Sequence, residues 1–217
     1  MNKISYSLAA LLLSCSANAT VIISDQIRTI DGDRDGQFDD LLISQVAFDV
    51  TAGTSLLIDS LVWESTGADL NGDGELTGFD NWMNLYSGST LLTANDDAPL
   101  GQDGSVHSFD SQINYFFSNA GTYMVTTGQL WYTQADALRG YQTDRTFTDY
   151  MQYTPFASAT SADHGDWQLT FNAHAGSVSN VRLLNPAGVA ATVPEPTSIA
   201  LLGLGLVGMG VARRRRS

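Results

Sequence analysis

The sequence predicts an all-β protein whose main domain, residues 20–192, is a single β-sandwich. Apolar residues alternate with polar residues in several short runs, which is the pattern of strands with one buried face. Glycine, aspartate and asparagine interrupt these runs at short intervals, as the turns of a sandwich require. No segment in this range keeps the 3.6-residue apolar period of an amphipathic helix. The length suits one domain with its own core.

The expected strands can be placed in order along the chain. Val46, Phe48 and Val50 alternate with polar residues, and Thr51-Ala52-Gly53 then turns the chain into the run 55–63. That run is apolar on both faces, so we expect it in the interior of a sheet. Asn119-Ala120-Gly121 forms a second turn between alternating runs. The remaining expected strands are 82–86, 89–92, 112–118, 122–127 and 167–171.

The predicted domain is strongly acidic. The chain has 23 acidic and 10 basic residues, and only Glu195, Lys3 and four C-terminal arginines lie outside this domain. The domain therefore carries 22 acids, all but two of them aspartate, against 5 arginines, a net charge of −17. Such a surface repels nucleic acid and attracts divalent cations. Solubility outside the cell accounts for scattered aspartates, but not for clustered ones.

One aspartate cluster, residues 69–80, has the spacing of a calcium loop. It places side-chain oxygens at positions 1, 3 and 5, glycine at position 6 and a carboxylate at position 12. Calcium takes six to eight oxygen ligands, which this spacing supplies from one segment. The spacing is similar to that of dockerin-type loops, and a plain polar turn is the alternative. The predicted Ca²⁺ ligands are Asp69, Asn71, Asp73, Glu75 through its carbonyl, and Asp80.

A second cluster, residues 31–42, opens in the same way but has Leu42 at position 12. Asp39 at position 9, or Asp40, could replace the missing carboxylate. The carboxylates of this segment repel one another, and either a bound cation or solvent exposure would relieve the repulsion. The candidate ligands here are Asp31, Asp33, Asp35 and Asp39.

The N-terminal residues 1–19 have the pattern of a secretory signal peptide. Lys3 supplies a positive charge, residues 8–13 an apolar core and Ala17-Asn18-Ala19 a cleavage site, so the mature chain would begin at Thr20. A lipoprotein box ending at Cys15 is the alternative. After ordinary cleavage no cysteine remains, so the exported domain must be stabilised by its core or by metal rather than by disulfides.

The C-terminal residues 193–217 combine a proline-bearing motif, an apolar helix and a basic end. The apolar run 199–212 would form a helix of about 21 Å, short against a bilayer core of about 30 Å. Four arginines follow it, which orients the segment with its end in the cytoplasm. A permanent anchor is one interpretation, but the marginal glycine-rich helix suits a transient, processed segment better.

This order of features resembles the PEP-CTERM sorting signal of Gram-negative bacteria, in which Pro194, Glu195 and Pro196 are the diagnostic residues. The resemblance implies transient insertion into the inner membrane and processing by an exosortase-type protease. It also implies delivery to the cell surface or the extracellular matrix.

The domain itself resembles the pre-peptidase C-terminal-type domains of secreted bacterial proteins. The similar segments include 48–54, 78–80, 85–92, 109–113 and 120–123, and the whole match covers about residues 46–184. The resemblance implies a jelly-roll-like sandwich with a calcium site near one edge. It assigns Asn95, Asp96, Asp97 and Asp110 as ligands, whereas the alternative is that they cap a turn and begin a strand. The 69–80 loop is an insertion relative to this family.

Catalytic motifs are missing from the sequence. His107, His164 and His174 form no closely spaced zinc motif, so we expect them to be loop or surface residues. There is no Gly-x-Ser-x-Gly elbow. We therefore expect a non-catalytic protein, with a secreted carbohydrate-active enzyme that uses paired aspartates as the alternative.

Aromatic residues crowd the segment 131–156, interleaved with aspartates. Aromatic faces beside acidic groups suit stacking on sugar rings, although the same residues could simply cover one end of the core. The sequence thus predicts an exported, calcium-stabilised surface or biofilm-matrix protein. Exopolysaccharide is its expected partner, and nucleic acid is not.

Overall fold

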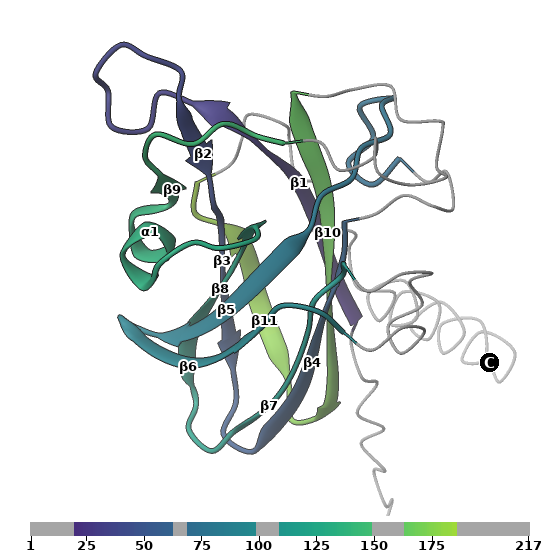
Figure 1. Cartoon of the computed structure of the whole chain (residues 1–217). Helices are drawn as coiled ribbons and strands as arrows, with labels where there is room; N and C mark the ends of the chain where they lie inside the picture. Colours follow the sequence, from purple (N-terminus) through teal and green to yellow (C-terminus); the bar gives the residue numbers. More distant parts are fainter. Residues whose placement is uncertain (1–19, 63–68, 99–108, 149–162, 186–217) are drawn as a thin grey trace, which may run out of the picture.

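The computed structural model describes residues 20–62, 69–98, 109–148 and 163–185 (Figure 1). The predicted signal peptide, the sorting signal, the apolar C-terminal helix and His107 lie outside these residues. Within them the chain forms two antiparallel sheets, which confirms the all-β, sandwich-like fold. The first sheet has the order β7 (Gln112–Phe117), β4 (Thr54–Leu61), β10 (His164–Ala175), β1 (Thr20–Ile30), β2 (Asp40–Leu42), β9 (Tyr141–Gln142). The second has the order β11 (Val178–Leu183), β3 (Ser44–Val50), β8 (Gly121–Gln129), β5 (Asn81–Ser87), β6 (Thr90–Asn95).

The core lies between the two sheets. Strand β4 alternates fully buried and half-buried residues, and its buried side chains Leu56 and Ile58 point into the core. Phe48 of the second sheet contacts Phe171 of the first with ring centroids 5.2 Å apart. Trp167 is fully buried, and its indole N–H donates to the Ser44 hydroxyl across the sandwich at 3.0 Å. Burial of these apolar faces is what holds the sheets together.

All the strands that the sequence predicts are present. The run predicted to lie inside a sheet is β4, between β7 and β10. Strands β1, β2, β9 and β11 were not predicted. The burial pattern of β1 shows why: β1 pairs with both β10 and β2, and three consecutive residues, Asp25, Gln26 and Ile27, are buried. A strand covered on both faces loses the alternation that identifies strands in a sequence.

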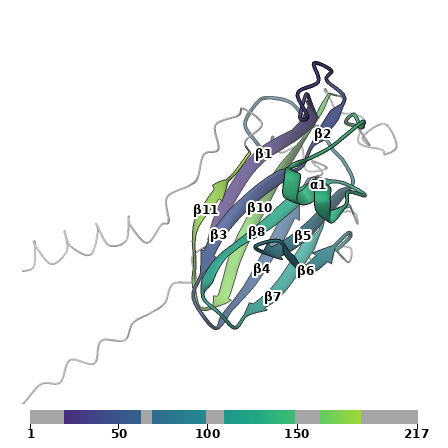
Figure 2. The same ribbon diagram turned by 90° about the vertical axis from the view of Figure 1, so that its left-hand side faces the viewer.

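A short helix, α1 (Gln134–Arg139), lies in the aromatic segment beside β9, at the end of the sandwich that also carries β2 (Figure 2). The Thr133 hydroxyl caps its first turn, and Asp136 completes the capping box. Gly140 ends it in the left-handed conformation, at φ 92°. Six residues are fewer than two helical turns, so no apolar period could reveal this helix.

The first residues of β10 position the candidate site. His164 pairs with Arg28, and Gly165 pairs with Ile27, both on β1. Gly165 has no side chain, which lets the rings of Phe79 and Phe147 pack edge to face against the strand, with centroids 6.2 Å apart. Because side chains alternate along a strand, His164 and Asp166 project from the same face. No helix within the described segments is long and apolar enough to cross a membrane.

Candidate metal centre

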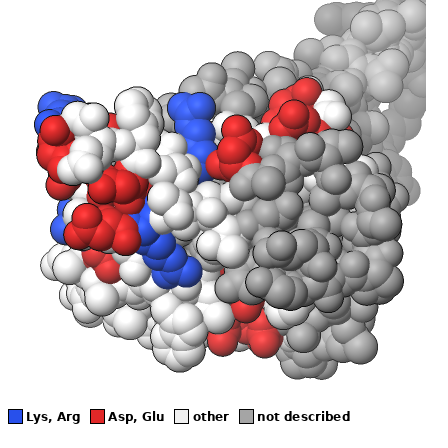
Figure 3. All heavy atoms as spheres, turned by 45° about the horizontal axis from the view of Figure 1, so that its top comes forward, with Lys and Arg blue, Asp and Glu red and all other residues white. Residues whose placement is uncertain are grey.

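Potential metal ligands gather in three clusters within the described residues. They are the histidine cluster, which consists of two groups that share His164 (Asp73, His164 and Asp166; Glu75, Asp163 and His164), the Asp80 cluster (Asp80, Asp96 and Asp97) and the Asp31 cluster (Asp31, Asp33 and Asp40). Figure 3 shows acidic side chains in separate groups rather than evenly spread over the face in view. Each cluster concentrates negative charge that a divalent cation could neutralise.

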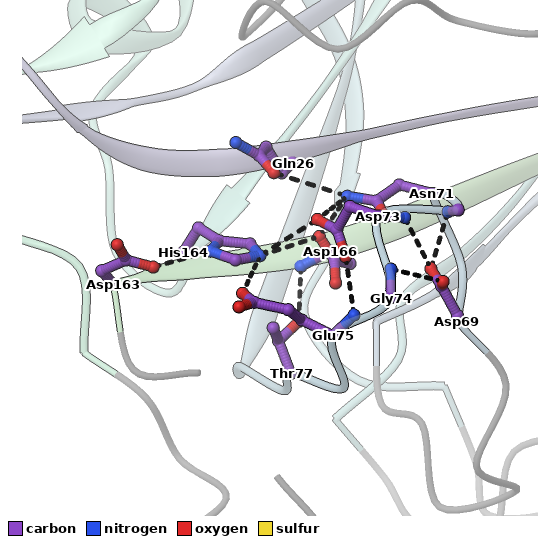
Figure 4. A network of polar contacts seen from close by, with 11 residues as sticks. Gln26, Asp69, Asn71, Asp73, Gly74, Glu75, Thr77, Asp163, His164 and Asp166 are labelled. Carbon is purple, nitrogen blue, oxygen red and sulfur yellow. Dashed lines mark hydrogen bonds and ion pairs between the residues drawn. The ribbon is translucent and has the colours of Figure 1, made fainter. Parts of the chain in front are cut away.

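The histidine cluster joins the loop at residues 69–77 to the start of β10 (Figure 4). His164 Nε2 lies 3.3 Å from Asp73 Oδ2, 3.5 Å from Glu75 Oε2 and 3.5 Å from Asp166 Oδ1. The other ring nitrogen, Nδ1, lies 2.7 Å from Asp163 Oδ1. His164 is only 7% exposed and Asp166 is fully buried, so the polar centre is largely shielded from water.

Asp69 holds the shape of the loop. Its carboxylate accepts from the backbone N–H of Gly72 at 2.6 Å and of Gly74 at 2.7 Å. Both glycines have positive φ, 85° and 92°, a conformation that favours glycine over other residues. These turns direct Asp73 and Glu75 towards His164, as Figure 4 shows.

Asn71 and Thr77 dock the loop on β10. The Asn71 amide donates to Asp73 Oδ2 at 2.9 Å and to Asp166 Oδ1 at 2.5 Å. The Thr77 hydroxyl accepts from the backbone N–H of Asp166 at 2.7 Å. Both oxygens of Asp166 are buried, and Oδ2 has no hydrogen-bond partner within the described part of the chain. The loop therefore fixes Asp166 while leaving one of its oxygens unsatisfied.

Burial controls the protonation of this cluster. It raises the pKa of Asp166 to about 7, an effect that the charge of His164 opposes and that of Asp73 reinforces. Burial alone would lower the pKa of His164, but the hydrogen bond to Asp163 and the charge of Asp166 outweigh it and raise that pKa. The cluster is thus costly to ionise fully in the absence of a cation.

The Asp80 cluster lies where β5 begins and β6 ends. Burial, then repulsion by Asp97 and Asp96, raises the pKa of Asp80 to about 6. The Ser111 hydroxyl lies within hydrogen-bond reach of the carbonyls of Asn81 and Asn95, both at 3.1 Å, and of that of Asp96, and so connects the two strand ends through its single proton. Three carboxylates converge here, and all of the donors are oxygens of the type that Ca²⁺ prefers.

The family resemblance also assigned Asn95 and Asp110, and the structure places both in backbone contacts. Asn95 Oδ1 accepts from the N–H of Gln112 at 2.8 Å. Asp110 is fully buried, and its Oδ1 accepts from the N–H of Val62 at 2.7 Å. Asp110 is not among the groups of potential ligands. Their ligand roles stay predictions.

In the Asp31 cluster the third carboxylate is Asp40, which the sequence offered as the alternative to Asp39. Asp40 is 1% exposed and accepts from the N–H of Gly32 at 2.8 Å and of Asp33 at 2.9 Å. Asp35 instead caps the next turn, because its Oδ1 accepts from the backbone N–H of Gln37 at 2.8 Å. Asp39 belongs to none of the groups of potential ligands in the described residues.

The structure distributes the ligands predicted for the 69–80 loop over two clusters. Asp73 and Glu75 lie with His164, whereas Asp80 lies with Asp96 and Asp97. The expectation that His164 is a loop or surface residue is wrong, because it begins β10 and is almost completely buried. For His174 the expected exposure is confirmed. The alternation of His164 and Asp166 was visible in the sequence, but their position beside the 69–77 loop was not.

The comparisons with known proteins concern the C-terminal segment. Residues 192–216 match the PEP-CTERM protein-sorting motif. A search of curated proteins finds no match to the chain. The resemblance of the sandwich to pre-peptidase C-terminal-type domains therefore stays a prediction. The match to the sorting motif includes Pro194, Glu195 and Pro196, the apolar run and the four arginines, which confirms the predicted signal. The chain carries the PEP-CTERM sorting signal, which exosortases recognise on exported, membrane-sorted proteins.

Proposed function

We propose that the chain is an exported, non-catalytic surface or matrix protein that is sorted through its C-terminal signal, stabilised by calcium and associated with exopolysaccharide. The PEP-CTERM motif at residues 192–216 carries this proposal, because it gives the protein its destination. The acidic, cysteine-free sandwich supports it, since such a domain outside the cell gains stability from bound cations.

Replacing Pro194, Glu195 and Pro196 by alanine in the full chain is expected to abolish processing. The unprocessed chain should then stay in the inner membrane, where fractionation and the mass of its C-terminal peptide will identify it. Pro186→Ala, which changes a proline upstream of the motif, is the matched control and should be sorted normally. Identical distribution of the triple variant and the wild type would refute sorting through this signal.

Calcium stabilisation is supported by the Asp80 cluster, whose donors are carboxylate oxygens. After treatment with a chelator, about 1 mM Ca²⁺ acting on a site with a Kd near 10⁻⁴ M should add about 1.4 kcal/mol. At roughly 2–4 °C per kcal/mol, calorimetry of the full chain should show a rise in Tm of about 3–6 °C. Asp97→Asn should reduce this rise. Asp49→Asn, the same charge change outside the three clusters, should not, and equal responses of the two variants would exclude the Asp80 cluster.

Association with sugar is supported by Trp131. Its side chain is 66% exposed, and its ring lies on that of Trp82 with centroids 5.0 Å apart. The backbone of Trp131 has φ 66°, and its carbonyl accepts from Arg145 at 2.8 Å and from Gln142 at 3.2 Å. An exposed indole that packs against a second indole, on a backbone held by two hydrogen bonds, is a suitable platform for a sugar ring. By contrast, Tyr132 and Phe147 are buried and cover the end of the core.

Trp131→Ala is expected to weaken binding to exopolysaccharide isolated from the producing organism by roughly 2–10-fold, the value of one aromatic stacking contact. Co-sedimentation or affinity electrophoresis of the full chain measures this change. Phe116→Ala is the matched control, because Phe116 is 63% exposed but lies on β7, at the edge of the first sheet opposite β9, whose Gln142 contacts Trp131. Equal losses in the two variants would mean that general surface hydrophobicity, not Trp131, binds the polysaccharide.

A further inference from the structure

We propose that Asp73, Glu75, His164 and Asp166 form a binding site for a zinc-type divalent cation, chemically different from the calcium expected at the carboxylate-only clusters. The site combines one imidazole nitrogen with carboxylates from the 69–77 loop and from β10. It stands on its own donors and does not depend on calcium binding at the Asp80 cluster.

The spacing of the donors fits a small cation. His164 Nε2 lies 3.3–3.5 Å from one oxygen of each of the three carboxylates. Zinc bonds to nitrogen and oxygen are about 2.0–2.1 Å long, so two ligands of a tetrahedral zinc lie about 3.3–3.4 Å apart. Measured from the imidazole, each carboxylate oxygen therefore lies near the separation of two zinc ligands. The donor atoms of Asp73, His164 and Asp166 also lie within 4.8 Å of one another, whereas Glu75 is grouped with His164 and Asp163.

The nitrogen ligand, His164 Nε2, distinguishes zinc from calcium at this site. Calcium takes six to eight ligands, all of them oxygens, at about 2.3–2.6 Å. Imidazole suits zinc and other late first-row metals, and mixed sets of histidine and carboxylate are common around zinc. Because His164 Nε2 faces all three carboxylates, a cation held by those carboxylates also meets a nitrogen ligand. This arrangement favours zinc over calcium.

Asp166 supplies an independent indication of a ligand. Its side chain is fully buried, and Oδ2 has no hydrogen-bond partner in the described part of the molecule. Asn71 and Thr77 nevertheless fix the residue in place beside His164. A buried, unsatisfied carboxylate oxygen is costly unless something pairs with it. A cation bound in the cluster would pair with this carboxylate.

The second ring nitrogen of His164 is held as metal-bound histidines require. Nδ1 lies 2.7 Å from Asp163 Oδ1, and a carboxylate there favours the ring orientation in which Nε2 is the atom that binds a metal. Asp163 is mostly exposed, so its role is to orient the ring. His164 and Asp163 also line a cavity of about 480 Å³, together with Gln26 and Arg28.

The test uses the purified full-length chain after chelation, titrated calorimetrically with ZnCl₂ and, separately, with CaCl₂. We expect zinc to bind saturably and to remain bound when calcium is added in about 100-fold excess. His164→Gln and Asp73→Asn should each weaken zinc binding at least about tenfold. Asp73 is exposed, so its variant keeps the fold even if His164→Gln does not. Co²⁺ in place of zinc should show visible absorption bands that both variants change.

Two control variants make the outcome unambiguous. His174→Gln removes an exposed histidine and should leave zinc affinity unchanged, whereas Asp97→Asn should affect calcium but not zinc. The proposal is overturned if His164→Gln and Asp73→Asn bind zinc like the wild type. It is also overturned if His174→Gln loses the binding, or if calcium displaces zinc at equal concentration. If zinc does not bind, the calcium proposal is unaffected, because the Asp97→Asn variant tests calcium binding at the Asp80 cluster separately.

Discussion

Asp166→Asn is expected to raise the Tm of the metal-free protein and, at the same time, to remove its stabilisation by zinc. The asparagine keeps the oxygen that accepts from Asn71, and it removes the buried charge of a carboxylate whose Oδ2 has no hydrogen-bond partner within the described residues. Relieving one buried unsatisfied group is worth about 1–3 kcal/mol. At roughly 2–4 °C per kcal/mol, the gain in Tm should be about 2–12 °C. Calorimetry with chelator and with zinc measures both effects.

The gain in Tm of Asp166→Asn over the wild type should increase with pH. The folded-state pKa of Asp166 is raised by burial to about 7, above the ordinary value of 3.8. At low pH the Asp166 carboxyl group is neutral in both the folded and the unfolded protein. The substitution then removes no charge, so it gives no gain in Tm for this reason. As the pH rises towards about 7, the unfolded wild type ionises more readily than the folded one, and the wild type loses stability relative to the variant. The difference in Tm should therefore grow from pH 4 to pH 7 and then level off.

Asp25→Asn is the matched control, since Asp25 is also a fully buried aspartate but belongs to none of the groups of potential ligands in the described residues. It should leave the zinc response intact. A fall in Tm for metal-free Asp166→Asn would mean that the carboxylate stabilises the fold by itself. Such a residue would be a structural anchor rather than a ligand that is costly without its cation.

The sequence predicted most of the sandwich because its half-buried strands keep their period of two. Phe48 and Val50 mark β3, and Ile113 and Phe117 mark β7. Strand β1 was not predicted because Asp25 and Gln26 are buried although polar, and because burial of three consecutive residues, 25–27, interrupts the alternation. The predicted strands were identified locally, whereas the order of the strands depends on pairings such as β1 with β10, which are far apart in the chain.

The candidate site was predictable only in its local parts. The spacing of Asp69, Asn71 and Asp73 identified a tight polar loop, and the structure has such a loop. The ligand at position 12, Asp80, was predicted from the calcium-loop spacing. That spacing assumes that every ligand of the segment contacts the same ion. Here Thr77 and Phe79 are buried between Asp73 and Asp80, so the chain enters the core and Asp80 emerges beside Asp96. The partners of Asp73 then come from β10, about 90 residues later, and no local spacing encodes that contact.

Gly165→Ala is expected to destabilise the protein and to weaken zinc binding together. A Cβ at this position would lie under 3.0 Å from atoms of both Phe79 and Phe147, too close for any ordinary contact. Overpacking of this kind costs about 1–3 kcal/mol, a loss in Tm of roughly 2–12 °C at about 2–4 °C per kcal/mol. Relief by movement of β10 would also displace His164 and Asp166, the residues on either side. Calorimetry for stability and zinc titration for affinity measure the two effects.

Two further variants separate crowding from the mere addition of a methyl group. Gly121→Ala adds the same methyl on β8, where the new Cβ would meet only Tyr123 at 3.8 Å, so it should be nearly neutral in both measurements. Phe147→Leu makes room beside the strand, and in combination with Gly165→Ala it should recover part of the lost zinc affinity. If Gly165→Ala lowers Tm but leaves zinc affinity unchanged, the strand start and the metal ligands are independent. Recovery by Phe147→Leu would instead show that the packing of two aromatic rings against one glycine sets the positions of His164 and Asp166.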